Sequence, residues 1–481
     1  MPNVIINDIK VEVPENVTVL EAIRLSGGYV PTLCHMKLDD IKIENNPASC
    51  RICMVEVAGR RNLAPACVTP IAEGMVIKTH SKKAVNARRT VLQLLLSNHP
   101  QDCLKCAKNG QCELQDLASE LFITTNPYMG NKSTHKKDVS AAIIRDPSKC
   151  IMCRKCETMC NSFQTVGVLS AVDRAFDAVV KPTFDLPLEQ TNCTFCGQCV
   201  AVCPTGALVA HTYIDEVWQE IDNPKKHVVV QTAPAVRVAI AEEFGYEPGT
   251  ISTGKLVSAL RALGFDKVFD TDFAADLTIM EEATEFLDRI KNGGYMPMLT
   301  SCCPGWVKFL EHQFPSLVEM PSSAKSPQQM FGAIAKSFYA EKNNIDPKDM
   351  TVVSIMPCIA KKYEAGRPEI NSSEYKDVDY VLTTRELARM IKEAGLNFDT
   401  LPEGQYDSPL GESTGAAVIF GRTGGVAEAA LRTAYEWITG KNLEAVEFEA
   451  VRGYEGVRVA EIKVGEMTVR VAVSHGLGNT R

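Results

Sequence analysis

The sequence predicts a multidomain α+β protein. Its 481 residues are about three times the usual length of a single domain. Fifteen of its 18 cysteines lie between Cys34 and Cys203, so the two halves of the chain differ in character. From about residue 216, short apolar runs alternate with amphipathic stretches, which is typical of an α/β domain with buried parallel strands.

The overall composition argues against a nucleic-acid-binding protein and against a membrane protein. Hydrophobic residues make up 45% and charged residues 23%, with a formal net charge of −8, so nucleic acid is not expected as the main partner. No apolar run could cross a membrane, and acidic residues near the start interrupt any signal-type segment, so we expect a cytoplasmic protein. In a reducing compartment, cysteines grouped in C-x-x-C steps indicate metal binding rather than disulfides.

Residues 1–79 are expected to form a first domain, a β-grasp fold of the [2Fe–2S] ferredoxin type. Alternating patterns at 4–13 and 54–59 predict strands, and 18–27 predicts one helix. Four cysteines with the spacing C-x15-C-x2-C-x13-C suit a [2Fe–2S] centre, although the first gap is longer than in plant-type ferredoxins. A structural zinc site is the alternative. These cysteines are Cys34, Cys50, Cys53 and Cys67.

Residues 80–141 form the second expected domain. Apolar spacing near 3.6 predicts a helix over 82–98, and the polar stretch 131–140 is expected to be a loop. At the end of the helix begins the pattern H-x3-C-x2-C-x5-C, which we interpret as a [4Fe–4S] cluster with one imidazole ligand, zinc being the alternative. The four predicted ligands are His99, Cys103, Cys106 and Cys112.

Residues 142–215 contain the one clear internal repeat. The spacing C-x2-C-x2-C-x3-C occurs twice, which is the pattern of two-cluster [4Fe–4S] ferredoxins. In that pattern the fourth cysteine of each run binds the other cluster. One cluster is therefore predicted on Cys150, Cys153, Cys156 and Cys203, and the other on Cys193, Cys196, Cys199 and Cys160.

Clusters in series transfer single electrons between a redox partner at one end and a two-electron reaction at the other. The catalytic site should therefore lie in the last expected domain, 216–481. Strands are predicted at 227–231, 267–272, 297–302 and 350–358, and helices at 276–291 and 326–342. The remaining three cysteines lie in TSCCPGW and SIMPCIAKKYEA, each after a predicted strand. Open α/β sheets build their sites at such carboxyl ends.

These segments resemble the [FeFe]-hydrogenase family. TSCCPGW and MPCIAKKYEA match the first two signature loops of its catalytic domain, and TAPAVR (232–237), IMEEATE (279–285) and SSAKSPQQ (322–329) match further segments. The cysteine groups before them resemble the accessory domains of larger members, which also resemble the peripheral large subunit of respiratory complex I.

The resemblance implies an H-cluster, a [4Fe–4S] cubane joined to a diiron unit. It makes Cys303 and Cys358 cubane ligands and Cys302 the free thiol that delivers protons to the distal iron. Lys361 matches the residue that hydrogen-bonds a cyanide of the diiron unit. The proton relay matches Glu282, Ser322 and Glu285, although acidic residues on such a helix would ordinarily form a solvated face. The diiron pocket matches Ala233, Pro234, Gln328 and Met356.

Two features depart from the family pattern. Ala235 stands where many members have Ser, so one cyanide hydrogen bond is expected to be missing. The third signature loop, with two further cysteines, is absent, and the sequence ends soon after the predicted strand VRVAVS. With only Cys303 and Cys358, half of the required thiolates are present. We interpret this as an omitted C-terminal segment, and a true truncation is expected to give no hydrogen turnover by the chain alone.

The function implied by the resemblance is 2H⁺ + 2e⁻ ⇌ H₂, coupled to NADH or ferredoxin through one [2Fe–2S] and three accessory [4Fe–4S] clusters. Expected partners are a flavin- and NADH-binding subunit, a small iron–sulfur subunit and ferredoxin, in a hetero-oligomer without membrane or nucleic acid. The alternative is a non-catalytic or sensory electron-transfer protein with a degraded site. A subunit of a molybdenum enzyme or of complex I would explain only 1–215.

Overall fold

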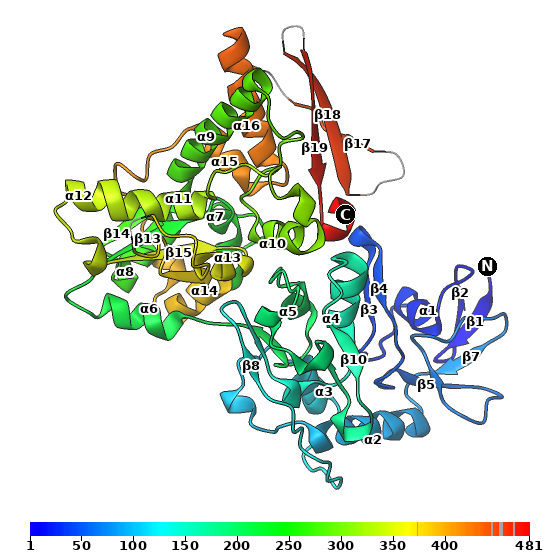
Figure 1. Ribbon diagram of the computed structural model, residues 1–481. Coiled ribbons are helices and arrows are strands. Elements are labelled where there is room, and N and C mark those ends of the chain that lie inside the picture. The colour runs from blue at the N-terminus through cyan, green and yellow to red at the C-terminus, as the bar shows by residue number, and fades with distance from the viewer. Residues whose placement is uncertain (373, 444–445, 452–455, 465–466) are drawn as a thin grey trace. The chain divides into compact units, whose positions relative to one another are not determined.

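A computed structural model describes the chain except residues 373, 444–445, 452–455 and 465–466. Its contacts divide the chain into two compact units (Figure 1). The first unit contains 1–192 and 198–210, and the second contains 193–197 and 211–481. Helices and sheets occur in both, which confirms the predicted α+β multidomain class.

A five-stranded sheet forms the start of the first unit, with the strand order β2-β1-β7-β5-β6. Strands β1 and β7 are parallel, and α1 packs against the sheet through Leu20 and Ile23, which are fully buried. Thr18 and Glu21 form a capping box that fixes the start of α1. The bounds are β1 Asn3–Ile6, β2 Ile9–Glu12, α1 Val19–Leu25, β5 Met54–Val57, β6 Ala64–Pro65 and β7 Val76–Lys78.

The rest of the first unit consists of short elements that connect the cysteine loops. Helix α2 spans Lys82–Asn98, as predicted, and Ser81 caps its start. The predicted loop at 131–140 contains a two-residue strand, β8, at its end. The other bounds are β3 Met36–Leu38, β4 Ile43–Asn45, α3 Glu113–Glu120, β8 Asp138–Val139, β9 Ile143–Arg145, α4 Lys155–Thr158, β10 Ser170–Val172, β11 Val179–Lys181, α5 Gln198–Val202 and β12 Leu208–Ala210.

The second unit is built on a parallel four-stranded sheet with the order β14-β13-β15-β16. Its strands are almost entirely buried, because helices cover both faces, with α9 and α11 on one side and α6, α8 and α14 on the other (Figure 1). The strands are β13 His227–Thr232, β14 Lys267–Asp270, β15 Met350–Met356 and β16 Tyr380–Thr383. The helices named here are α6 Ile214–Ile221, α8 Thr253–Leu263, α9 Thr271–Asn292, α11 Pro327–Ile334 and α14 Thr384–Glu393.

One strand prediction in this unit is wrong. Residues 297–302 form no strand; Leu299 makes only an isolated parallel bridge with Pro321. Prolines at 297 and 321 have no N–H to donate to a ladder, so pairing cannot extend beyond this bridge.

The end of the chain forms an antiparallel sheet, β17-β18-β19. The predicted strand VRVAVS lies within β19, and Gly424 at the start of α16 packs against Val473. Among the described residues, no helix combines the length and apolar character that crossing a bilayer would require. The remaining bounds are α7 Val236–Ala239, α10 Pro304–Gln313, α12 Ala340–Lys342, α13 Ala360–Ala365, α15 Gly415–Val418, α16 Gly425–Thr439, β17 Glu449–Ala450, β18 Val457–Val464, β19 Met467–Ser474 and α17 Leu477–Thr480.

Candidate metal centres and active site

The first cysteine group is brought together beside the five-stranded sheet. All four thiols are buried, with exposed fractions of 0–4%. The sulfurs of Cys53 and Cys67 are 3.3 Å apart, and Cys34 is hydrogen-bonded to Cys50. Within each pair the hydrogen bond lowers the pKa of one thiol, Cys34 or Cys53, and raises the pKa of its partner. Two adjoining sulfur pairs in an apolar pocket fit a [2Fe–2S] group.

The second group lies where α2 ends. His99 is the residue after the helix, and its Nδ1 is buried without a hydrogen-bond partner among the described residues. Desolvation lowers the pKa of His99 to about 4, so the ring is neutral. A buried imidazole nitrogen with no donor or acceptor opposite it fits a metal ligand. Cys112 is buried at the start of α3, and Cys103 is exposed.

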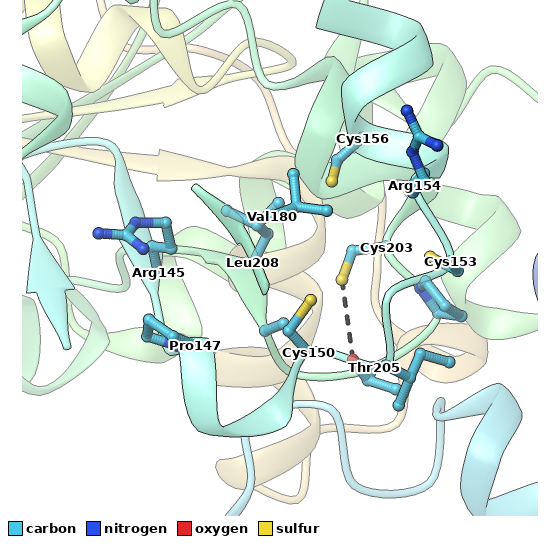
Figure 2. A pocket seen from close by; sticks show the side chains of 13 residues that line it. Arg145, Pro147, Cys150, Cys153, Arg154, Cys156, Val180, Cys203, Thr205 and Leu208 are labelled. Atoms are coloured by element: carbon cyan, nitrogen blue, oxygen red, sulfur yellow. Dashed lines mark hydrogen bonds between the residues drawn. The ribbon is translucent and has the colours of Figure 1, made fainter. Parts of the chain in front are cut away.

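The third group lines one small cavity (Figure 2). Cys150, Cys153 and Cys156 line it from one run, and Cys203 lines it from the repeat. Burial raises the pKa of Cys153 to about 12. The structure therefore brings together the crossed set that the spacing predicts for one cubane.

The fourth group is divided between the two units. Cys193 and Cys196 lie in the segment 193–197 of the second unit, whereas Cys160 and Cys199 belong to the first. Their assignment to one cluster stays a prediction.

The segment 193–197 is closely packed within the second unit. Phe195 is 1% exposed, and its ring stacks on Tyr363 with centroids 4.8 Å apart. The Lys308 ammonium lies 4.6 Å from the Phe195 centroid and 4.4 Å from that of Tyr363, a cation–π arrangement. Gly197 has φ +78°, and a Cβ there would meet Ile359 at 2.6 Å. The segment with two predicted ligands thus contacts the residue next to Cys358.

The candidate active site lies at the switch point of the parallel sheet. Chain order reverses between the neighbouring strands β13 and β15, and open α/β sheets bind ligands outside the carboxyl ends of such strands. Ala233 and Pro234 follow β13, and Cys358 follows β15, whose last residue is Met356. The Ala233 amide donates to the carbonyl of Ile355 at 3.0 Å, which joins the two ends.

Lys361 links the two signature loops. Its Nζ donates to the Cys302 carbonyl oxygen at 2.9 Å and to Glu364 at 3.0 and 3.1 Å. Glu364 is 4% exposed and also accepts hydrogen bonds from Ser326 (2.9 Å) and Gln328 (3.0 Å). Sequence reasoning missed Glu364, although its i,i+3 spacing from Lys361 was visible in IAKKYEA.

The two adjacent cysteines differ in their surroundings. Cys303 is exposed and is the residue just before α10. Desolvation and then the charge of Glu282 raise the pKa of the Cys302 thiol to about 12, so it keeps its proton at neutral pH. Burial also raises the pKa of Cys358, a predicted ligand, so the proton-carrying role of Cys302 stays a prediction.

Two of the predicted relay residues lie on the middle of α9, and the third, Ser322, contacts one of them. Glu282 is 1% exposed, and its Oε1 has no hydrogen-bond partner among the described residues. Burial raises the pKa of Glu282 to about 7. Ser322 donates to Glu285 at 2.7 Å, and no hydrogen bond joins Glu282 to Ser322 in the described part of the chain. Sequence reasoning also missed Arg289, whose guanidinium binds Glu285 at 2.6 Å.

Buried side-chain atoms without hydrogen-bond partners indicate whether this pocket fits a cofactor with polar ligands. Gln328 is 1% exposed, and its Oε1 is unpaired among the described side chains, as is Oε1 of Glu282. With Cys303, Cys358 and the Lys361 ammonium nearby, the donor set fits an anionic iron–sulfur group with polar ligands. In the described residues, no three or more His, Cys, Asp or Glu side chains close around a single metal ion.

Comparison with known proteins decides the family. Residues 226–481 match the family described as "Iron only hydrogenase large subunit, C-terminal domain". The chain is 59% identical to the NADP-reducing hydrogenase subunit HndD of Solidesulfovibrio fructosivorans, over 98% of the chain and 81% of that protein. The chain belongs to the [FeFe]-hydrogenase family. Iron hydrogenase 1 of Clostridium pasteurianum is 38% identical over 100% of the chain and 83% of its own length.

Solved structures agree with this family. An apo [FeFe]-hydrogenase from Chlamydomonas reinhardtii matches 56% of the chain and 77% of its own, with 44% identity and a TM-score of 0.52. The earlier part of this [FeFe]-hydrogenase chain matches three iron–sulfur families. They are a 2Fe-2S cluster binding domain over 3–82, the NADH-ubiquinone oxidoreductase-G iron-sulfur binding region over 88–127, and a 4Fe-4S dicluster domain over 149–207.

Proposed function

We propose that this [FeFe]-hydrogenase chain interconverts protons and dihydrogen, 2H⁺ + 2e⁻ ⇌ H₂, at the pocket beside Cys302. One observation carries the proposal. Lys361, three residues after Cys358, binds the carbonyl of Cys302 beside the carboxyl end of β15, and the charge of the buried Glu282 acts on the Cys302 thiol. This arrangement combines a proton donor with ligands for an electron-storing group, which is what the reaction requires.

In this proposal Cys303 and Cys358 are two of the thiolates that would hold the cubane of the H-cluster. When bound, the whole H-cluster would supply the open iron position and the stored electrons. Cys302 holds a proton on Sγ and exchanges it with Glu282, whose raised pKa leaves it able to accept and release a proton near neutral pH. Glu285, held by Ser322 and Arg289, is the outer end of the relay. Lys361 and Gln328 orient polar ligands in the pocket.

We further propose that the four-part organisation of the sequence serves an electron relay. One [2Fe–2S] cluster is held by the Cys34 group, one [4Fe–4S] by the His99 group, and two by the repeated runs. The crossed set around the cavity of Figure 2 supports one of the two clusters proposed on the repeated runs. The partners are flavin- and NADH-binding and small iron–sulfur subunits and ferredoxin, in a cytoplasmic hetero-oligomer, because the relative HndD is named as a subunit of an NADP-reducing hydrogenase.

The test is Cys302→Ser in the anaerobically prepared chain with its partner subunits. A serine hydroxyl holds its proton too tightly, so hydrogen evolution should fall by at least about a hundredfold while the iron–sulfur spectra stay unchanged. Cys303→Ser is the matched control, and it should lose the spectrum of the cubane. Full turnover with Cys302→Ser would contradict the proposal. Absence of turnover in the unmodified complex with intact clusters would favour the electron-transfer alternative.

A further inference from the structure

The side chain of Asn45 joins two cysteine groups of the first unit. Asn45 is the last residue of β4 and is 3% exposed. Its Nδ2 donates to the carbonyl oxygen of Cys34 at 2.5 Å and to that of Cys153 at 2.9 Å. Cys34 belongs to the proposed [2Fe–2S] site, and Cys153 lines the cavity of the proposed [4Fe–4S] site. One amide nitrogen therefore uses both of its hydrogens to bridge two ligand backbones.

A third hydrogen bond fixes the orientation of this amide. The Thr158 hydroxyl donates to Asn45 Oδ1 at 2.6 Å. Thr158 lies on α4 between two predicted ligands, so all three bonds end in cluster-binding segments. Because both carbonyl oxygens can only accept, the nitrogen must face them. A buried amide whose two N–H groups and oxygen are all satisfied is a rigid connection.

We propose that Asn45 is a positioning residue that couples electron transfer between these two sites. Its bonds hold the two ligand-bearing backbones at a fixed spacing and complete a hydrogen-bonded path between Cys34 and Cys153. Transfer moves one electron from one site to the other, and the carboxamide keeps both protons and gains or loses no electron. Hydrogen bonds outside the ligand shell orient ligands and tune potentials, so losing Asn45 should affect both sites. This inference rests on the proposed assignment of clusters.

The neighbouring residue provides a matched control. Asn46 Nδ2 donates to the carbonyl of Cys67 at 2.6 Å, a predicted ligand of the first site only. Asn46 is therefore the same residue type, one position away, with a bond to one site instead of two.

The experiment compares Asn45→Leu with Asn46→Leu in the full-length chain, prepared anaerobically with its clusters. Leucine keeps the branching and the number of side-chain heavy atoms of asparagine and removes its donors and its acceptor. Potentiometric titration followed by electron paramagnetic resonance should show that Asn45→Leu shifts the potentials of both sites and that Asn46→Leu shifts only the [2Fe–2S] potential. After a one-electron pulse, intercluster transfer should slow by about tenfold in Asn45→Leu alone.

Thr158→Val is a second variant that tests the same proposal if Asn45→Leu does not fold. It removes the hydroxyl that orients the amide, keeps the shape, and should shift both potentials in the same direction by less. The proposal is wrong if the folding variant with wild-type iron content shifts one site only or transfers electrons at the wild-type rate. If the unmodified chain shows no [2Fe–2S] and [4Fe–4S] signals, the proposed function fails instead.

Discussion

At the scale of single residues, burial separates side chains that look alike in the sequence. Glu281 and Glu282 are adjacent on α9, yet Glu281 is exposed and Glu282 is buried. An amphipathic helix with three acidic residues ordinarily presents them to solvent. Here the helix turns Glu282 toward Cys302, and desolvation rather than a partner raises its pKa. The family motif indicated this role; the acidic pattern alone did not.

The first residue-scale prediction concerns Glu282. With a pKa near 7, its carboxyl is protonated below that pH and loses its proton as the pH rises through 7. Hydrogen evolution, which consumes the acid form, should fall over the same range. Glu282→Gln should lower turnover by about a hundredfold or more, because an amide transfers no proton.

Infrared titration of the full-length protein checks the assignment of the group. The band of protonated carboxyls should disappear near pH 7 in the wild type and be weaker in Glu282→Gln, where the buried Asp272, with a pKa also raised to about 7, still contributes. Glu281→Gln, one position away and exposed, is the control and should leave both the band and the rate unchanged. A band that titrates near the ordinary Glu value of 4.5 would mean that Glu282 is solvated.

At the scale of elements, the predicted ligands lie in short loops, and the flanking helices and strands position these loops. Spacing predicted α2 to the residue and placed strands at β13, β14 and β15. It also predicted a strand at 297–302, where only Leu299 makes a bridge. The apolar composition suggests a strand, but prolines lack the backbone N–H groups that donate hydrogen bonds in a β-ladder. The cysteine loop nevertheless reaches its place, because Lys361 holds the Cys302 carbonyl.

The element-scale prediction concerns Gly197, next to the predicted ligand Cys196. Gly197→Ala would place a Cβ 2.6 Å from Ile359, in addition to the strain of φ +78°. Gly167→Ala is the matched control, since its φ is +76° and nothing lies within 4 Å. We expect the control to cost about 1 kcal/mol and Gly197→Ala clearly more, measured by thermal unfolding. If the double variant Gly197→Ala/Ile359→Ala regains stability, the clash with Ile359 is the cause. Equal losses of stability in Gly197→Ala and Gly167→Ala would contradict this explanation.

At the scale of the whole molecule, the two units differ in what stabilises them. The second unit has a large continuous core around its parallel sheet. The first unit has smaller clusters of buried residues, and cysteines predicted as ligands are themselves part of these cores. Small domains with limited cores commonly depend on metal cross-links, since metal binding energy becomes folding energy.

This difference leads to a prediction for iron removal. Anaerobic oxidation followed by chelation should make 1–192 sensitive to protease, while the sheet β13–β16 stays protected. Limited proteolysis with mass spectrometry of the full chain checks this, with untreated protein as the control. Equal loss of protection in both units would show that the large core also depends on clusters.

Sequence by itself determined the fold class and predicted which residues supply the ligands, because cluster spacing is local and strand patterns repeat over a few residues. It named Cys302, Cys303 and Cys358 but could assign their roles only through resemblance. Tertiary structure decided which carboxylate is buried and that Asn45 joins two distant cysteine groups. Burial and hydrogen-bond partners arise where segments far apart in the chain pack together, and no local pattern contains that information.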